Sequence, residues 1–109
     1  MAVTNPLTDD VSPVVLINVF KCDTGRQDEL VEQLTDLVGV QRDLPGFISA
    51  VLHRGVNGRH VANYAVWRTA VDWKAMTRHP SVVERMSPIM AVATFEPHLY
   101  EAGEVVESA

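Results

Sequence analysis

Two asparagines interrupt stretches of the chain that are otherwise apolar. Asn18 lies within Val14–Phe20, and Asn63 lies within Val61–Trp67. Burying a side-chain amide without a hydrogen-bond partner costs about 1–3 kcal/mol. Each amide therefore needs either a structural partner or a cavity that it can face.

Asn63 also shares a strand face with a tryptophan. Residues two or four apart on a strand point to the same side of a sheet, so Asn63, Ala65 and Trp67 share one face. A small residue between an amide and an indole can form the floor of a flat pocket. The same pattern fits a core tryptophan beside a hydrogen-bonded asparagine, and the periodicity leaves both interpretations open.

A histidine and an arginine are further candidates for a site. His53 lies on the sheet face opposite Asn63 if the turn after it has two residues, and on the same face if the strand bulges before that turn. Arg85 belongs to a short predicted helix. From there its guanidinium can either reach an anion in a pocket or remain in solvent.

The sequence carries no pattern typical of a metal or nucleotide site. Its four histidines are scattered, and Cys22 is the one cysteine. A metal site needs three or four convergent ligands. The six glycines form no phosphate-binding loop. We therefore expect neither a metal ion nor an organic cofactor.

Apolar runs predict four strands, at 14–20, 47–54, 59–68 and 94–100. Asn-Gly between the second and third strands is typical of a hairpin turn. Pro97 places the last strand at an edge of the sheet or at a bulge.

Helical periodicity predicts helices in the segments between the first and second strands and between the third and fourth. A capping box of Thr24 and Gln27 begins the first helix. A second helical segment begins near Thr69 and is interrupted at Pro80, and Pro88 limits the short helix that follows.

This order, βαββαβ, predicts a ferredoxin-like α+β fold: an antiparallel sheet with the helices on one face. The first and third strands are apolar on both faces, so a monomer would expose an apolar sheet face. We therefore expect a homodimer in which the two open faces pack together.

Length and composition predict one ordinary globular domain of 109 residues. We expect a flexible arm over residues 1–12, the domain over 13–102 and an acidic tail over 103–109. Nine Lys and Arg against fourteen Asp and Glu give a net charge of −5, which argues against nucleic acid and anionic membranes as partners. No stretch is apolar for long enough to span a membrane, and we expect a cytoplasmic protein.

Four segments resemble the antibiotic biosynthesis monooxygenase (ABM) family. Val61–Arg68 is similar to its V-x-N-Y-x-x-W strand, and Ile17–Phe20, Leu44–Phe47 and Phe95–Tyr100 are similar in order and spacing. The resemblance implies a dimeric α+β barrel. It also implies an oxygenase that converts an anthrone, polycyclic phenol or hydroquinone to a quinone with O₂ and without metal or flavin. A non-oxidative polyketide cyclase or isomerase and a non-enzymatic ligand-binding dimer are the alternatives.

The resemblance also implies roles for particular residues. Asn63, Trp67 and Arg85 would orient and stabilise the substrate anion, and the base would be His53 or the substrate's own acidity. Trp73 stands where the anthrone oxygenases have a tyrosine, and Asn18 matches an asparagine of haem-degrading relatives, whose haem-ligating histidine has no counterpart here. The expected substrate contacts are Asn18, Tyr64, Trp73 and Met86.

Overall fold

Strands and helices follow one another along the chain in the order that the sequence predicts. The computed structural model describes residues 12–109, so the expected N-terminal arm lies outside the described residues except for Ser12. Residues 102–109 are exposed and have no regular secondary structure. The elements are β1 (Val14–Cys22), α1 (Gln27–Gln41), β2 (Phe47–Arg54), β3 (His60–Trp67), α2 (Ala70–Thr77), α3 (Pro80–Val92) and β4 (Ala93–Glu101).

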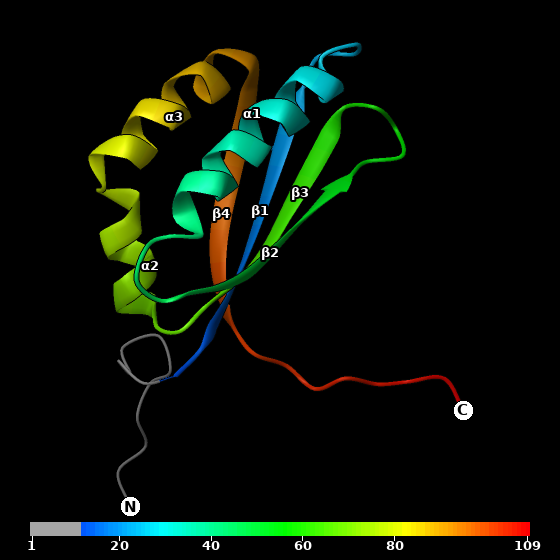
Figure 1. Cartoon of the computed structure of the whole chain (residues 1–109). Helices are drawn as coiled ribbons and strands as arrows, with labels where there is room; N and C mark the ends of the chain where they lie inside the picture. Colours follow the sequence, from blue (N-terminus) through cyan, green and yellow to red (C-terminus); the bar gives the residue numbers. More distant parts are fainter. Residues whose placement is uncertain (1–11) are drawn as a thin grey trace, which may run out of the picture.

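The strands of this part of the chain form an antiparallel sheet in the order β2-β3-β1-β4. The helices cover one face of the sheet and leave the other face open (Figure 1). Strand β1 is a central strand, as its apolar run predicts, and the ferredoxin-like α+β prediction is confirmed.

Side chains of the two central strands alternate between the helices and the open face. On β1, Leu16, Asn18 and Phe20 point toward the helices and are buried. On β3, Asn63 and Trp67 do the same. This alternation places both asparagines on the side of the sheet where the apolar core lies. The core continues into α1 through Leu30, Leu34 and Leu37.

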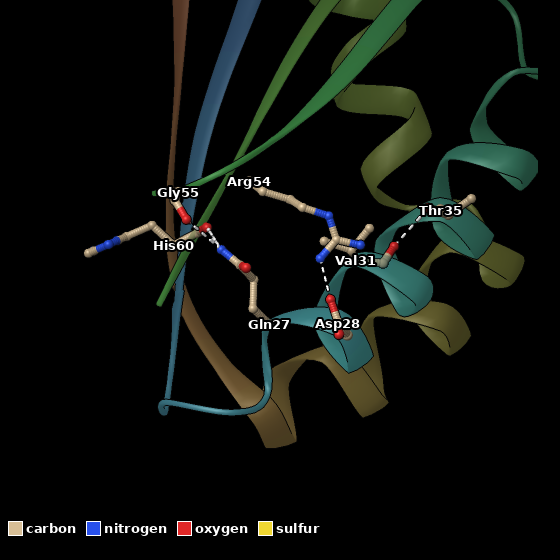
Figure 2. Close-up of polar contacts among 7 residues, drawn as sticks. All are labelled: Gln27, Asp28, Val31, Thr35, Arg54, Gly55 and His60. Atoms are coloured by element: carbon tan, nitrogen blue, oxygen red, sulfur yellow. Dashed lines mark hydrogen bonds and ion pairs between the residues drawn. The ribbon is translucent and has the colours of Figure 1, made fainter. Parts of the chain in front are cut away.

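The first helix begins three residues later than its predicted N-cap. Arg26 is the N-cap residue, and it makes no side-chain capping bond. The prediction of a capping box between Thr24 and Gln27 is therefore wrong. The Gln27 side chain does not cap the helix. It points away from the helix end and binds the β2–β3 hairpin instead (Figure 2).

That hairpin is attached to the start of α1 by side chains. Gln27 Nε2 donates to the backbone carbonyls of Gly55 and His60, each at 2.9 Å (Figure 2). Beside it, Asp28 forms an ion pair with Arg54 of β2. Each of these carbonyls also accepts a backbone hydrogen bond within the hairpin, so the glutamine uses their second lone pairs and ties the hairpin to the helix.

The second helical segment is divided as predicted, but its second part is longer. Thr69 is the N-cap of α2, and its side chain accepts a 3.0 Å hydrogen bond from the backbone N–H of Asp72. After the break at Pro80, α3 continues through Pro88 to Val92. The prediction that Pro88 limits this helix is therefore wrong. Pro88 lies on the exposed side of α3, where water can satisfy the carbonyl that loses its partner.

Pro97 lies in β4, which is an edge strand, as its sequence predicts. An edge strand can lose a backbone N–H from one side without breaking a ladder bond.

Gly46 joins the end of α1 to β2 in a conformation that favours glycine. Its φ is +87°, and a Cβ at this position would overlap the side chain of Asp72. We expect Gly46→Ala to lower the free energy of unfolding by at least about 1–2 kcal/mol, from the backbone strain alone. Chemical denaturation followed by circular dichroism measures this change.

Gly39 provides the matched control. It lies inside α1, and a Cβ there would meet no atom within 4 Å. We expect Gly39→Ala to raise stability by about 0.5–1 kcal/mol, because alanine is the better helix former. Equal stability changes in the two variants would contradict this reading of Gly46.

The open face of the sheet carries large apolar side chains. Val19 of β1, Val51 of β2, Tyr64 of β3 and Tyr100 of β4 are each 43–47% exposed. They come from all four strands, so the exposed apolar surface is continuous across the sheet. Among the described residues, no helix is both long enough and apolar enough to cross a membrane.

Candidate functional site

A cavity of about 500 Å³ lies between the sheet and the helices. Its walls come from strands β1, β3 and β4 and from all three helices. Most of the wall is apolar and includes Leu16, Phe20, Leu37, Met76 and Met86. This size and character are typical of a site for a small organic ligand.

The sheet side of the cavity carries two side-chain amides next to each other. Asn18 of β1 lies directly opposite Asn63 of β3 in the strand register. Their side chains are 8% and 3% exposed and line the cavity. Cβ atoms of directly opposite residues lie about 4.5–5.5 Å apart. The two amides therefore form one polar patch on an apolar wall.

Neither amide of this pair is satisfied by the protein. The carbonyl oxygens of Asn18 and Asn63 are buried and have no hydrogen-bond partner. Buried polar groups are nearly always paired, so an unpaired one on the wall of a cavity is a candidate for pairing with a ligand. The sequence left open whether these amides face a structural partner or a cavity, and the structure places them at a cavity.

The helical side of the cavity carries an indole N–H. Trp73 lies in the first turn of α2, which the Thr69 cap begins. Its Nε1 atom is buried and has no hydrogen-bond partner, and its side chain lines the cavity. An indole nitrogen can only donate. Trp73 therefore brings a donor without a protein partner to the wall of the cavity.

These polar atoms define what the cavity can bind. Unpaired carbonyl oxygens accept a hydrogen bond from a ligand hydroxyl, and the amide and indole N–H groups donate to a ligand carbonyl or phenolate. The rest of the cavity suits an apolar body. All of the described side chains that line it are uncharged. An aromatic ring system with several oxygen substituents fits this arrangement.

Four of the residues singled out from the sequence meet at this cavity. They are Asn18, Asn63, Trp73 and Met86. They come from β1, β3, α2 and α3, so the ferredoxin-like fold brings together parts of the chain that are distant in sequence.

The other four lie elsewhere in this chain. Trp67 is fully buried and packs edge-to-face against Phe47, with 5.4 Å between the ring centroids. Tyr64 points to the open face.

His53 pairs with Ala62 of β3 and is exposed on that same open face, the face that a two-residue turn predicts. The turn itself is longer than predicted: the hairpin closes at Gly55 and His60, and Gly58 alone has a positive φ there.

Arg85 is exposed on α3 and does not line the cavity, although Met86, the next residue, does. Successive helical residues point about 100° apart, so Met86 can line the cavity while Arg85, one position earlier, points into solvent.

Gln41 is a cavity residue that the sequence reading missed. It is the last residue of α1, is 7% exposed and lines the cavity. A signal was present in the sequence: Gln41 continues the stripe of Leu30, Leu34 and Leu37 along the buried side of the helix. A polar residue at a core position of an amphipathic helix is as informative as an asparagine in an apolar strand.

Metal ligands do not gather anywhere in the described part of the chain. Within residues 12–109, no group of three or more His, Cys, Asp or Glu side chains could hold a metal ion. The cavity's donor set consists of amides, hydroxyls and an indole, which suits hydrogen bonding to an organic ligand.

Known proteins are similar to this chain in sequence or in fold. The chain is 35% identical over 86 residues to the tetracenomycin-F1 monooxygenase of Streptomyces glaucescens, covering 75% of this chain and 74% of that protein. SnoaB, a cofactor-independent oxygenase from Streptomyces nogalater, has a similar fold: the TM-score is 0.81 at 19% identity, covering 89% of this chain and 99% of that one. A conserved protein from Methanosarcina mazei gives a TM-score of 0.76 at 9% identity, covering 85% and 95%.

The family match agrees with these likenesses. Residues 13–84 match the family described as antibiotic biosynthesis monooxygenase. This match covers both asparagines and Trp73, and it ends just before Met86. The chain therefore belongs to the antibiotic biosynthesis monooxygenase family, whose fold is that of the dimeric α+β barrels.

Proposed function

We propose that this protein is a cofactor-independent monooxygenase that oxidises an anthrone, polycyclic phenol or hydroquinone to a quinone with O₂. The observation that carries the proposal is the apolar cavity with three unpartnered polar side chains, Asn18, Asn63 and Trp73. The tetracenomycin-F1 monooxygenase, at 35% identity, supports the reaction class and an aromatic polyketide substrate.

The substrate itself supplies the electrons in this reaction. A deprotonated anthrone is an electron-rich carbanion that can reduce O₂ directly. One oxygen atom forms a bond to the ring carbon, and loss of water from the resulting hydroperoxide leaves the quinone carbonyl. In total, the substrate CH₂ group and O₂ become a C=O group and one H₂O. The protein has to hold the ring, exclude water and stabilise negative charge on the ring oxygen.

Each polar residue of the cavity has a place in this scheme. The amide N–H groups of Asn18 and Asn63 donate to the developing oxyanion, and their carbonyls accept from a neighbouring hydroxyl. Trp73 donates to a second ring oxygen from the helical side. Met86 and the other apolar residues contact the ring body. Preorganised neutral donors in a dry cavity stabilise an anion more strongly than water does.

We propose that the substrate loses its first proton through its own acidity, without a protein base. The described side chains around the cavity are uncharged, and His53 lies on the other face of the sheet. Of the two bases that the family resemblance implies, the substrate's acidity in solution is the one that fits this geometry. The ring then enters the cavity as an anion, or loses its proton to water at the cavity mouth.

The open sheet face supports a homodimer. Its exposed apolar side chains, Val19, Val51, Tyr64 and Tyr100, come from all four strands. A contiguous apolar patch of this kind is typical of an interface. We propose that two copies pack these faces together, which would place His53 and Tyr64 in or beside the interface and away from the chain's own cavity.

Oxygen consumption tests the proposed function. Metal-stripped, flavin-free protein is given a panel of anthrones and hydroquinones in an oxygen electrode, with Asn63→Ala in parallel. We expect uptake above the uncatalysed rate, one O₂ per quinone formed, and little uptake by the variant. Turnover that persists without O₂ would point instead to a cyclase or isomerase. Saturable binding without any turnover would point to a ligand-binding dimer.

A further inference from the structure

Gln41 makes a poor hydrogen bond for a buried amide. Its Nε2 atom donates to the thioether sulfur of Met76 at 3.3 Å. Within residues 12–109 this is the hydrogen bond that its side chain makes. A thioether is a weak acceptor, so burying Gln41 costs more than this contact returns.

The position of Gln41 explains why it is tolerated. Both partners of this contact line the cavity, Gln41 from the end of α1 and Met76 from α2. Trp73, one helical turn before Met76, also lines this cavity, and its indole N–H has no protein partner. The helical wall of the cavity therefore contributes a weakly bonded amide and a donor without a partner, and the sheet wall contributes the Asn18–Asn63 pair.

We infer that Gln41 is a specificity-determining residue that binds an oxygen substituent of the ring substrate. This inference rests on the proposed function for the class of ligand. The amide exchanges its contact with sulfur for a hydrogen bond to a ring hydroxyl or carbonyl, because oxygen is the better partner. The substituent bound by Gln41 lies toward the helices, whereas the oxygen of the reacting centre lies at the asparagine pair. Gln41 thus selects rings by their pattern of hydroxylation.

The test is a comparison of Gln41→Met with Gln33→Met. Methionine keeps the length of the side chain and removes the amide. Gln33 is the matched control because it lies in the same helix, also has a buried unpartnered carbonyl oxygen, and does not line the cavity. Two probes that are already at the oxidation level of the product are titrated, a dihydroxyanthraquinone and the same ring system without hydroxyls. Quenching of tryptophan fluorescence reports binding, since Trp73 lines the cavity.

We expect Gln41→Met to weaken binding of the hydroxylated probe by about 3- to 10-fold, as for the loss of one hydrogen bond. Binding of the unsubstituted ring should change by less than about 2-fold, so the preference for hydroxylated rings falls. The ligand-free variant should melt no lower than the wild type, because an apolar side chain replaces a poorly bonded amide. Gln33→Met should leave the preference unchanged.

Three outcomes would overturn the inference. An equal loss of affinity for both probes, or a melting temperature several degrees lower, would assign Gln41 a purely structural role. An unchanged preference in Gln41→Met, with both rings still bound, would remove Gln41 from recognition and leave the proposed function intact. Failure of the wild type to bind either ring would contradict the proposed substrate class together with the role of Gln41.

Discussion

Replacing Asn63 with alanine is expected to lower kcat by about 10- to 1000-fold, the range found when a donor to a developing oxyanion is removed. KM should change much less, because the apolar walls that hold the ring remain. The measurement is steady-state oxygen uptake with the best substrate of the panel. Asn63 is 3% exposed and its carbonyl has no protein partner, so the variant loses no hydrogen bond that stabilises the ligand-free fold.

Gln33→Ala is the matched control for this experiment. Its buried carbonyl oxygen is also unpartnered, but Gln33 lies outside the cavity wall, and we expect its kcat to stay within about 2-fold of wild type. Asn18→Ala and the double variant extend the test. Because Asn18 lies opposite Asn63 in the strand register, the two effects should be less than additive if both amides serve the same oxyanion. A folded Asn63→Ala protein with an unchanged rate would exclude this residue from the mechanism.

Replacing Ile17 with aspartate is expected to disrupt the proposed homodimer. Ile17 lies on the open face of central strand β1, between Tyr64 of β3 and His98 of β4. Removing a carboxylate from water into an apolar interface costs several kcal/mol even with the His98 imidazole on the neighbouring strand, which weakens self-association by about 100-fold. Sedimentation velocity over a concentration series measures the effect, and circular dichroism checks that the protomer remains folded.

Val56→Asp is the control for the added charge. Val56 is fully exposed in the loop between β2 and β3, outside the strands that form the open face, so this variant should associate like the wild type. The proposed interface would be refuted by a wild type that sediments as a monomer at micromolar concentrations. A folded Ile17→Asp protein that stays dimeric would refute it equally.

The strands and the fold could be predicted from sequence because their signals are local and repeated. The apolar runs, the Asn-Gly turn and Pro97 each agree with the observed sheet. The helix boundaries were less predictable. Gln27 is drawn away from a capping box by two hairpin carbonyls that are distant in sequence, and Pro88 is tolerated because its side of α3 faces solvent. The first case was decided by a tertiary contact and the second by solvent exposure, and neither can be read from the local sequence.

The candidate site was partly predictable because two of its residues lie on strands, where the alternation of side chains is a local signal. Asn18 and Asn63 stand out because strand alternation assigns each to the buried face, and the register then places them together. Alternation says nothing about how far along that face the cavity extends. It therefore could not show that Phe47 covers Trp67, and that Trp73 supplies the indole at the cavity. Gln41 could have been predicted as well, because it is a polar residue in the buried apolar stripe of a helix.

The position of β1 between β3 and β4 has a consequence for folding. Asn18 lies beside Asn63 on one side and beside Pro97 on the other, so the sheet joins the two ends of the described chain. Closing so long a loop is entropically costly, and folds dominated by such contacts form slowly. The amide pair forms once β1 meets β3, but the cavity wall is complete only when β4 docks. Ligand binding is therefore a property of the fully folded chain and of no shorter segment of it.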